Sequence, residues 1–290
     1  MISNIVITSI ITGGVYALLA SGFSLIFGVA RIMNMAHTAF YMICGVLLFI
    51  LGVKLHQPIF LSVPLAILIT IVVAMACYKL FFDRVKEHIT AVILISAALA
   101  LLFQEVFLLG LTGQYQRVPS FIAGSVTCAG IKTTYQHVIA ACVSIITLFA
   151  LWCLLTKTRL GIAIRAVAED SEIANVMGIN VSLINMITMG ISAALAGIAA
   201  VVVAPIYMVY PLMWIQPLTI VLAAVVLGGL GSVKGAVIAA YVIAFVEVSV
   251  TSLIPGGSFL KGAAAMSAMV IILFVKPEGL FGVVFEEERL

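Results

Sequence analysis

Long runs of apolar residues are the feature that most restricts what this chain can fold into. Residues 59–80, 89–111 and 137–155 each reach or approach the roughly 20 residues that a helix needs to cross the hydrocarbon layer of a bilayer. Hydrophobic residues make up 64% of the chain and charged residues only 9%, far from the values of water-soluble domains. The period-two alternation typical of membrane barrel strands is absent. The sequence therefore predicts an all-α polytopic membrane protein whose 290 residues form a single transmembrane domain.

The remaining apolar segments set the number of crossings. One of them, residues 218–252, is too long for a single crossing and is broken at residues 228–232 (GGLGS). It is expected to form either two spans or a re-entrant hairpin whose backbone is shielded by protein. Eight to nine transmembrane helices or half-helices are therefore predicted. The other apolar segments are 5–29, 33–53, 181–204 and 259–275.

A polar segment, residues 158–180 (TRLGIAIRAVAEDSEIANVMGIN), interrupts the apolar pattern. Three of the chain's 11 acidic residues, Glu169, Asp170 and Glu172, fall within four positions of it. Small and apolar residues recur in the segment at helical spacing, and Gly178 is suited to a left-handed helix stop. These features predict one amphipathic helix at about 160–178 that lies in water and docks on a partner. An ordinary solvated loop helix is the alternative.

The basic residues indicate the orientation, because short cytoplasmic loops retain Lys and Arg. If the polar segment is cytoplasmic, ten basic residues lie inside and four outside, and the opposite orientation reverses this bias. The N-terminus is therefore expected outside and the C-terminus in the cytoplasm. The inside set is Arg31, Lys79, Arg84, Lys86, Lys157, Arg159, Arg165, Lys234, Lys276 and Arg289, and the outside set is Lys54, Arg117, Lys132 and Lys261.

Three blocks of residues share a pattern with a known family. The first holds Gly14-Val15-Tyr16-Ala17-Leu18, Phe27-Gly28-Val29, Asn34-Met35-Ala36-His37 and Tyr41-Met42. The second holds Thr158, Gly161, Arg165-Ala166, Asp170, Ala174 and Gly178-Ile179, and the third holds Leu227-Gly228-Gly229-Leu230-Gly231-Ser232 with Gly235-Ala236. Together they resemble the permeases of branched-chain amino acid ABC importers of the LivH/LivM type, and are most similar to LivH. That family commonly continues its Ala-His pair with Gly-Glu, whereas Thr38-Ala39 follow His37 here.

The resemblance implies the ABC importer permease fold and a place in the inner membrane of a bacterium or archaeon. In such an importer an external solute-binding protein delivers the solute, two permeases in the lipid bilayer enclose the path, and two cytoplasmic ABC ATPase subunits drive transport. The second permease is expected to be a homologous partner, with a homodimer as the alternative. Branched-chain or other small amino acids are the implied solutes, with urea and short amides as the alternative. The residues expected to couple to the ATPases are Arg165, Ala166, Glu169, Asp170, Glu172, Ala174 and Gly178.

Polar side chains inside apolar segments are the candidates for the solute path. Asn34, His37 and Tyr41 fall at i, i+3 and i+7, so on a helix they would share a face that lines a wet path or bonds to other helices. For His37 a packing role is the simpler interpretation. Glu105 and Glu247 lie deep in spans, where carboxylates are unfavourable and usually face a cavity or a partner; a neutral structural role is the alternative for both.

A second one-face series lies on the first span, where Thr8, Thr12 and Tyr16 recur every four residues. Tyr16 is added to the candidate path, although such hydroxyls can also bond to backbone carbonyls. The uncharged aromatic segment 205–214 fits a belt at the membrane interface, with contact to the binding protein as the alternative.

Other classes of protein fit less well. The glycine-rich block at 228–235 lacks the Gly-Lys-Ser/Thr ending of a phosphate loop, so it is interpreted as a helix break and no ATPase site is expected. Paired aspartates, a His-Glu metal cluster and a serine beside a base are all missing, which argues against an enzyme. The five cysteines show no metal spacing, so no cofactor or metal is expected, and no nucleic acid partner either. The rival hypothesis is an ion-coupled secondary transporter that uses Glu105 and Glu247.

Overall fold

Helices dominate the computed structural model, which describes residues 2–86, 88–111, 113–122, 124–128, 131–277 and 279–281. Within those ranges, seven helices are long and apolar enough to cross a membrane. In chain order the elements are α1 (Ile2–Ala30), α2 (His37–Phe49), the π-helix η1 (Ile50–Lys54), α3 (Ile59–Cys77), the π-helix η2 (Tyr78–Phe82), α4 (Asp83–Val85), α5 (Ile89–Leu111), β1 (Ser125–Cys128), β2 (Ile131–Thr134), α6 (Tyr135–Lys157), α7 (Arg159–Glu169), α8 (Ser171–Val176), α9 (Val181–Val203), α10 (Ile215–Gly228), α11 (Val233–Leu253), the 3₁₀-helix η3 (Gly257–Leu260) and α12 (Lys261–Val275).

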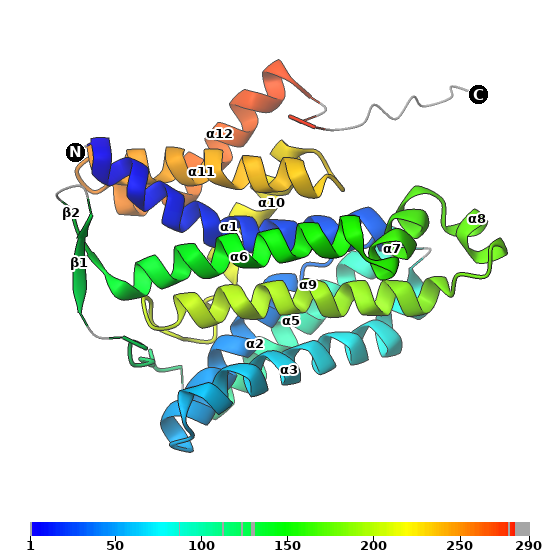
Figure 1. The fold of residues 1–290 in the computed structure, drawn as a ribbon, viewed down its shortest axis with the longest axis horizontal. Coiled ribbons are helices and arrows are strands. Elements are labelled where there is room, and N and C mark those ends of the chain that lie inside the picture. Colours follow the sequence, from blue (N-terminus) through cyan, green and yellow to red (C-terminus); the bar gives the residue numbers. More distant parts are fainter. Residues whose placement is uncertain are drawn as a thin grey trace.

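The helix α1 lies at the centre of the bundle, in contact with α11, α9 and α6 (Figure 1). Small residues allow this close packing: a Cβ on Gly22 would lie 2.8 Å from Cε1 of His37 on α2, and a Cβ on Gly13 would collide with the ring of Tyr241 on α11. The helices α3, α5 and α6 lie at the periphery and expose large apolar side chains such as Phe60, Leu109 and Phe149. This is the arrangement expected of a bundle surrounded by lipid.

The long apolar segment near the C-terminus is divided at the glycine-rich break into α10 and α11. Gly229 and Gly231 have φ angles of 96° and 84°, which favour glycine. The hydroxyl of Ser232 then accepts a hydrogen bond of 3.1 Å from the Gly235 amide and starts α11. Gly28 of α1 packs on this break, since its Cβ would lie 2.9 Å from the Gly231 carbonyl oxygen. The break is thus a fixed contact of the bundle.

The predicted number of eight to nine crossings is not confirmed. Besides the seven long spans, α10 and α12 are shorter apolar helices of 14 and 15 residues. At about 1.5 Å per residue each is only about 21–23 Å long, less than the roughly 30 Å of a hydrocarbon core. Both are therefore half-helices by length.

A small β-hairpin adds to the predicted all-helical bundle. The strands β1 and β2 pair antiparallel, with Ser125 opposite Thr134, in the long polar connection between α5 and α6. The hairpin and the N-terminus lie at one end of the bundle, and α7 and α8 lie at the opposite end (Figure 1). We call these the hairpin end and the α7–α8 end. The acidic C-terminal residues 286–288, with Arg289, lie outside the described residues.

Candidate functional site

The α7 helix folds tightly against the end of α6. Thr158 caps it by accepting a 3.0 Å hydrogen bond from the Gly161 amide, while its own hydroxyl lies 2.7 Å from the Leu154 carbonyl oxygen. Gly161 has no room for a side chain, because a Cβ there would collide with the Leu154 carbonyl. Ile164 and Val167 are buried on the same side. This face fixes α7 to the bundle and leaves the opposite face free.

The prediction of one helix over 160–178 is wrong, because the polar segment forms two helices joined at Asp170. Asp170 has extended backbone angles, φ −150° and ψ 111°, and its Oδ1 accepts hydrogen bonds from the amides of Glu172 (2.8 Å) and Ile173 (2.9 Å). The carboxylate competes with the backbone for these amides and so starts α8 as an N-cap. Gly178 has a φ of 88°, which confirms the left-handed stop after α8.

The outer surface of α7 and α8 combines charge with exposed apolar side chains. Arg165, Glu169, Asp170, Glu172 and Gly178 are exposed, Ala166 is half-buried, and Ala174 is buried against the protein, so Ala174 does not belong to this outer surface. Four large apolar side chains are exposed beside the charges: Ile162, Ile173, Val176 and Met177. The sequence pattern does not single out Ile173 and Val176, because it predicts one continuous helix.

A hollow of about 870 Å³ lies beside the junction of α7 and α8. Its lining brings the basic residues Arg31 and Lys86 to the same space as the acidic residues Glu169, Asp170 and Glu172. The end of α1, the end of α4 and the start of α9 therefore meet around the polar segment.

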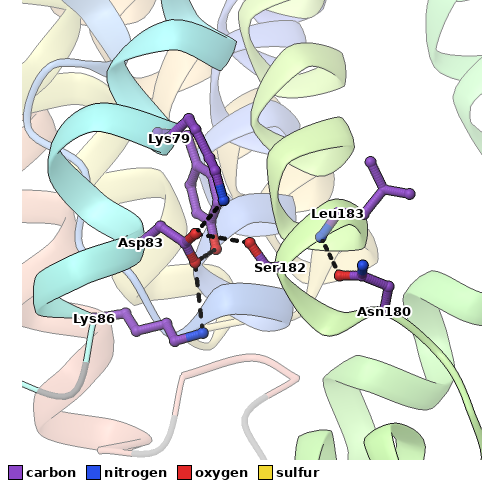
Figure 2. A network of polar contacts seen from close by, with 7 residues as sticks. Lys79, Asp83, Lys86, Asn180, Ser182 and Leu183 are labelled. Atoms are coloured by element: carbon purple, nitrogen blue, oxygen red, sulfur yellow. Dashed lines mark hydrogen bonds and ion pairs between the residues drawn. The ribbon is translucent and has the colours of Figure 1, made fainter.

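A polar network ties α9 to α4 at this end (Figure 2). The carboxylate of Asp83 lies 2.9 Å from Lys79 Nζ and 3.6 Å from Lys86 Nζ, and it accepts a 2.8 Å hydrogen bond from the Ser182 hydroxyl. Asn180 accepts a 3.0 Å hydrogen bond from the Leu183 amide and caps α9. The start of α9, which follows α8 directly, is thereby held to a neighbouring span.

A cavity of about 290 Å³ opens among the helices toward the hairpin end. The predicted series Thr8, Thr12 and Tyr16 lines one wall of it, and Tyr41 of α2 lines another. Lys261, the first residue of α12, also reaches the cavity. Two of the predicted path residues, Tyr16 and Tyr41, are thus brought together.

Glu247 is buried and contacts two residues that line this cavity, Tyr16 and Lys261. Tyr16 donates a 2.9 Å hydrogen bond to Glu247 Oε2, and Lys261 Nζ lies 3.7 Å from Glu247 Oε1. The Glu247 side chain is only 2% exposed, whereas that of Lys261 is 33% exposed. The carboxylate is therefore paired within the protein, and the ammonium is the charge that faces the space.

The prediction that Asn34, His37 and Tyr41 share a helix face is wrong for Asn34, because α2 begins only at His37. Asn34 accepts a 3.0 Å hydrogen bond from the Ala36 amide and is fully buried. The Nε2 of His37 lies 3.0 Å from the Leu19 carbonyl oxygen, and its Nδ1 lies 2.9 Å from the Ser192 hydroxyl. A carbonyl only accepts, so Nε2 carries the hydrogen and Nδ1 accepts from Ser192. Both ring nitrogens of His37 are therefore bonded within the protein, which agrees with the packing role and not with a place on the solute path.

Glu105 lies apart from the cavity, exposed on the outer face of α5. Its Oε1 accepts a 3.1 Å hydrogen bond from Gln104, whose own oxygen accepts one of 3.0 Å from the Trp214 indole. The two carboxylates that the sequence placed deep in spans therefore have separate surroundings.

A bundle of apolar helices with a charged helical segment at one end and a cavity toward the other has the architecture of a membrane permease. The family model described as branched-chain amino acid transport system / permease component matches residues 5–275, and the chain belongs to this family. The predicted family and fold class are thereby confirmed.

Several branched-chain amino acid permease proteins are similar along nearly the whole chain. The high-affinity branched-chain amino acid transport system permease protein BraD of Pseudomonas aeruginosa is 27% identical, over 95% of this chain and 94% of its own. LivH of Escherichia coli K12 is 28% identical over 93% and 92% of the two chains, and a probable LivH of Methanocaldococcus jannaschii is 28% identical over 95% and 91%. A solved structure, PsaBC from Streptococcus pneumoniae in complex with Fab, shares the fold with a TM-score of 0.51 at 16% identity, over 93% and 91% of the chains.

Proposed function

We propose that this chain is the transmembrane permease subunit of an ATP-binding cassette importer that moves branched-chain or other small amino acids across an inner membrane. The observation that carries the proposal is the family match over residues 5–275. The relatives BraD and LivH are permease proteins of branched-chain amino acid transport systems. The chain supplies the passage, and separate ATPase subunits supply the energy.

The α7–α8 segment is the coupling element in this proposal. Its buried face is fixed to α6, while Ile173, Val176 and Met177 form an exposed apolar surface beside Glu172. A short helical segment of this kind can lie in a groove of a partner and transmit its displacement to the attached spans. Because Asp83 ties α9 to α4, a push on α8 would reach two spans together.

The assembly has its α7–α8 end in the cytoplasm, with two ABC ATPase subunits, and its hairpin end outside, where the solute-binding protein docks. A second permease, homologous or identical, completes the path. Glu105 supports a protein neighbour on the outer face of α5, because a carboxylate exposed at that depth is unfavourable against hydrocarbon. The same face carries Leu102 and Val106, both more than half exposed.

The ion-coupled alternative has less support. Its two proposed carboxylates do not act together, because Glu247 of α11 is engaged by Tyr16 and Lys261, while Glu105 lies on α5 and bonds to the adjacent Gln104. Import of urea or short amides by the same kind of assembly is the alternative that concerns the solute alone.

Reconstituted uptake tests the proposal. The permease is placed in proteoliposomes with its ATPases, second permease and binding protein, and radiolabelled leucine is supplied on the binding-protein side. Uptake that requires ATP and the ATPases, and that valine but not urea inhibits, is the expected result. Uptake driven by an ion gradient without the ATPases would overturn the proposal, and ATP-driven uptake of urea in place of leucine would overturn the solute assignment.

A further inference from the structure

The cavity toward the hairpin end has the composition of a site for a small zwitterion. Its volume of about 290 Å³ lies just below the roughly 300–1,000 Å³ typical of ligand pockets, so it suits a small molecule of amino acid size. Among the described residues that line it, none is acidic, and Lys261 is the one lysine or arginine. Lys261 therefore gives the cavity a positive charge that attracts an anionic group of a ligand.

The ammonium of Lys261 is held in place yet keeps hydrogen-bonding capacity. Its 3.7 Å separation from Glu247 Oε1 is an ion pair that is longer than a hydrogen bond. A lysine ammonium has three donors, and a third of this side chain is exposed. Glu247 cannot replace Lys261 as the ligand-binding group, because its carboxylate is buried and bonded to Tyr16.

The lining of the cavity also includes aromatic rings and hydroxyl groups. Tyr41, Tyr115, Tyr207 and Tyr210 all line it, and the rings of Tyr115 and Tyr210 lie 4.8 Å apart. Burial raises the pKa of Tyr210 above its ordinary value, and the neighbouring Tyr115 adds to this effect. The phenol therefore stays neutral near pH 7. Neutral tyrosines attract a primary ammonium through the faces of their rings and through their hydroxyl oxygens.

Apolar side chains complete the lining. Ile11, Val15 and Leu19 of α1 contribute one apolar wall, and Met213 and Ile220 contribute another. An aliphatic side chain buried there gains hydrophobic stabilisation, whereas a polar one loses its hydration.

We propose that this cavity binds an α-amino acid with an apolar side chain, its carboxylate on Lys261 Nζ, its ammonium among the tyrosines and its side chain against α1 and α10. This inference rests on the proposed function, since it assigns the solute of that function to a binding site with named residues. Glu247 and Tyr16 act as positioning residues, because they hold Lys261 at the cavity.

Equilibrium binding to the purified permease in lipid nanodiscs tests the site without the other subunits. Tritiated leucine is the probe, and scintillation proximity measures its binding at millimolar concentrations. Saturable binding is expected, with leucinamide, which lacks the carboxylate, and 4-methylvalerate, which lacks the ammonium, each competing about tenfold more weakly than leucine. Absence of saturable leucine binding, or equal competition by either analogue, would overturn the proposal.

Substitutions assign the binding to this cavity. Lys261→Gln is expected to weaken leucine binding about tenfold or more, and Lys261→Arg to retain most of it. The matched control is Lys54→Gln, an exposed lysine at the end of another span, which should leave binding unchanged. If Lys261→Gln does not fold, two further variants decide: Lys261→Gln combined with Glu247→Gln removes both charges, and Thr12→Phe fills the cavity while the ion pair stays intact.

The outcomes for this site and for the proposed function can be distinguished. Leucine binding at the wild-type level in the double variant and in Thr12→Phe rules out the site, even if the complete importer performs ATP-driven uptake. Failure of that uptake in the wild-type importer counts against the proposed function, while leucine binding lost in Lys261→Gln and kept in Lys54→Gln still supports the site.

Discussion

Substitutions of Asp170 can test two properties of the α7–α8 junction separately: its backbone geometry, which the Asp170 cap stabilises, and its charge. Its Oδ1 bonds to two amides at the start of α8, a helix of only six residues in which Ala174 is the buried side chain. Loss of an N-cap costs about 1 kcal/mol, within a range of roughly 0.5–2 kcal/mol. A helix so short has little other stabilisation, so about 1 kcal/mol reduces the ratio of ordered to disordered α8 roughly fivefold.

The series Asp170→Asn, Asp170→Ala and Asp170→Lys follows from this estimate. Asparagine caps about as well as aspartate and loses only an exposed charge, which contributes about 0–1 kcal/mol to an ion pair. Alanine removes the cap, and lysine removes the cap and reverses the charge. Transport is therefore expected to fall slightly in Asp170→Asn, several-fold in Asp170→Ala and furthest in Asp170→Lys, with the protein still folded in the membrane.

The assay measures leucine uptake and ATP hydrolysis in the same proteoliposomes. Uncoupling appears as uptake that falls while ATP hydrolysis continues. The control is Ser171→Ala, which changes the neighbouring exposed side chain, lies outside the predicted coupling residues, leaves the Asp170 cap in place and should retain most of the transport. Wild-type transport in Asp170→Lys would refute the coupling role, and an equal loss in Asp170→Asn and Asp170→Ala would refute the role of the cap.

Three further substitutions test the contacts that hold the bundle. His37→Ala should lower the melting temperature in detergent, because it leaves a buried carbonyl and the Ser192 hydroxyl unpaired at about 1–3 kcal/mol; an unchanged melting temperature would contradict the packing role. Gly231→Ala should destabilise more than Gly256→Ala, because both have positive φ but a Cβ on Gly231 would lie 3.3 Å from the α1 backbone and one on Gly256 meets nothing within 4 Å; thermal unfolding compares them. Asp83→Ala should increase hydrogen exchange at the start of α9, since it removes the bond to Ser182, and unchanged exchange would show that the network does not hold α9.

The spans could be predicted closely because length and apolar composition decide them. The segment 89–111 coincides with α5, and 181–204 coincides with α9 to within one residue. The glycine-rich break was also visible, because positive φ angles at Gly229 and Gly231 favour glycine. The junction at Asp170 could have been found too, since aspartate is a common N-cap, but the helical spacing on both sides concealed it.

The sites could be predicted only in part, because distant residues assemble them. Tyr16 and Glu247 are separated by 231 positions, and the sequence singled out each without pairing them. The sequence pattern places Lys261 only among the external charges, since its contact with Glu247 depends on how α12 packs. Glu105 resembled Glu247 in the sequence, yet one is exposed on α5 and the other is buried. Local pattern gives the depth of a residue in a span, and only tertiary packing gives its neighbours.

Photo-cross-linking tests most directly whether the α7–α8 segment receives the ATPase. Benzoylphenylalanine is placed at Ile173 on α8 and, as the control, at Ile146 on the outer face of α6; the native side chains are 62% and 66% exposed. In the assembled importer, irradiation is expected to link position 173 to an ATPase subunit and to leave position 146 unlinked to it. ATPase cross-links from position 146 with none from position 173 would contradict the assignment of this segment as the coupling surface.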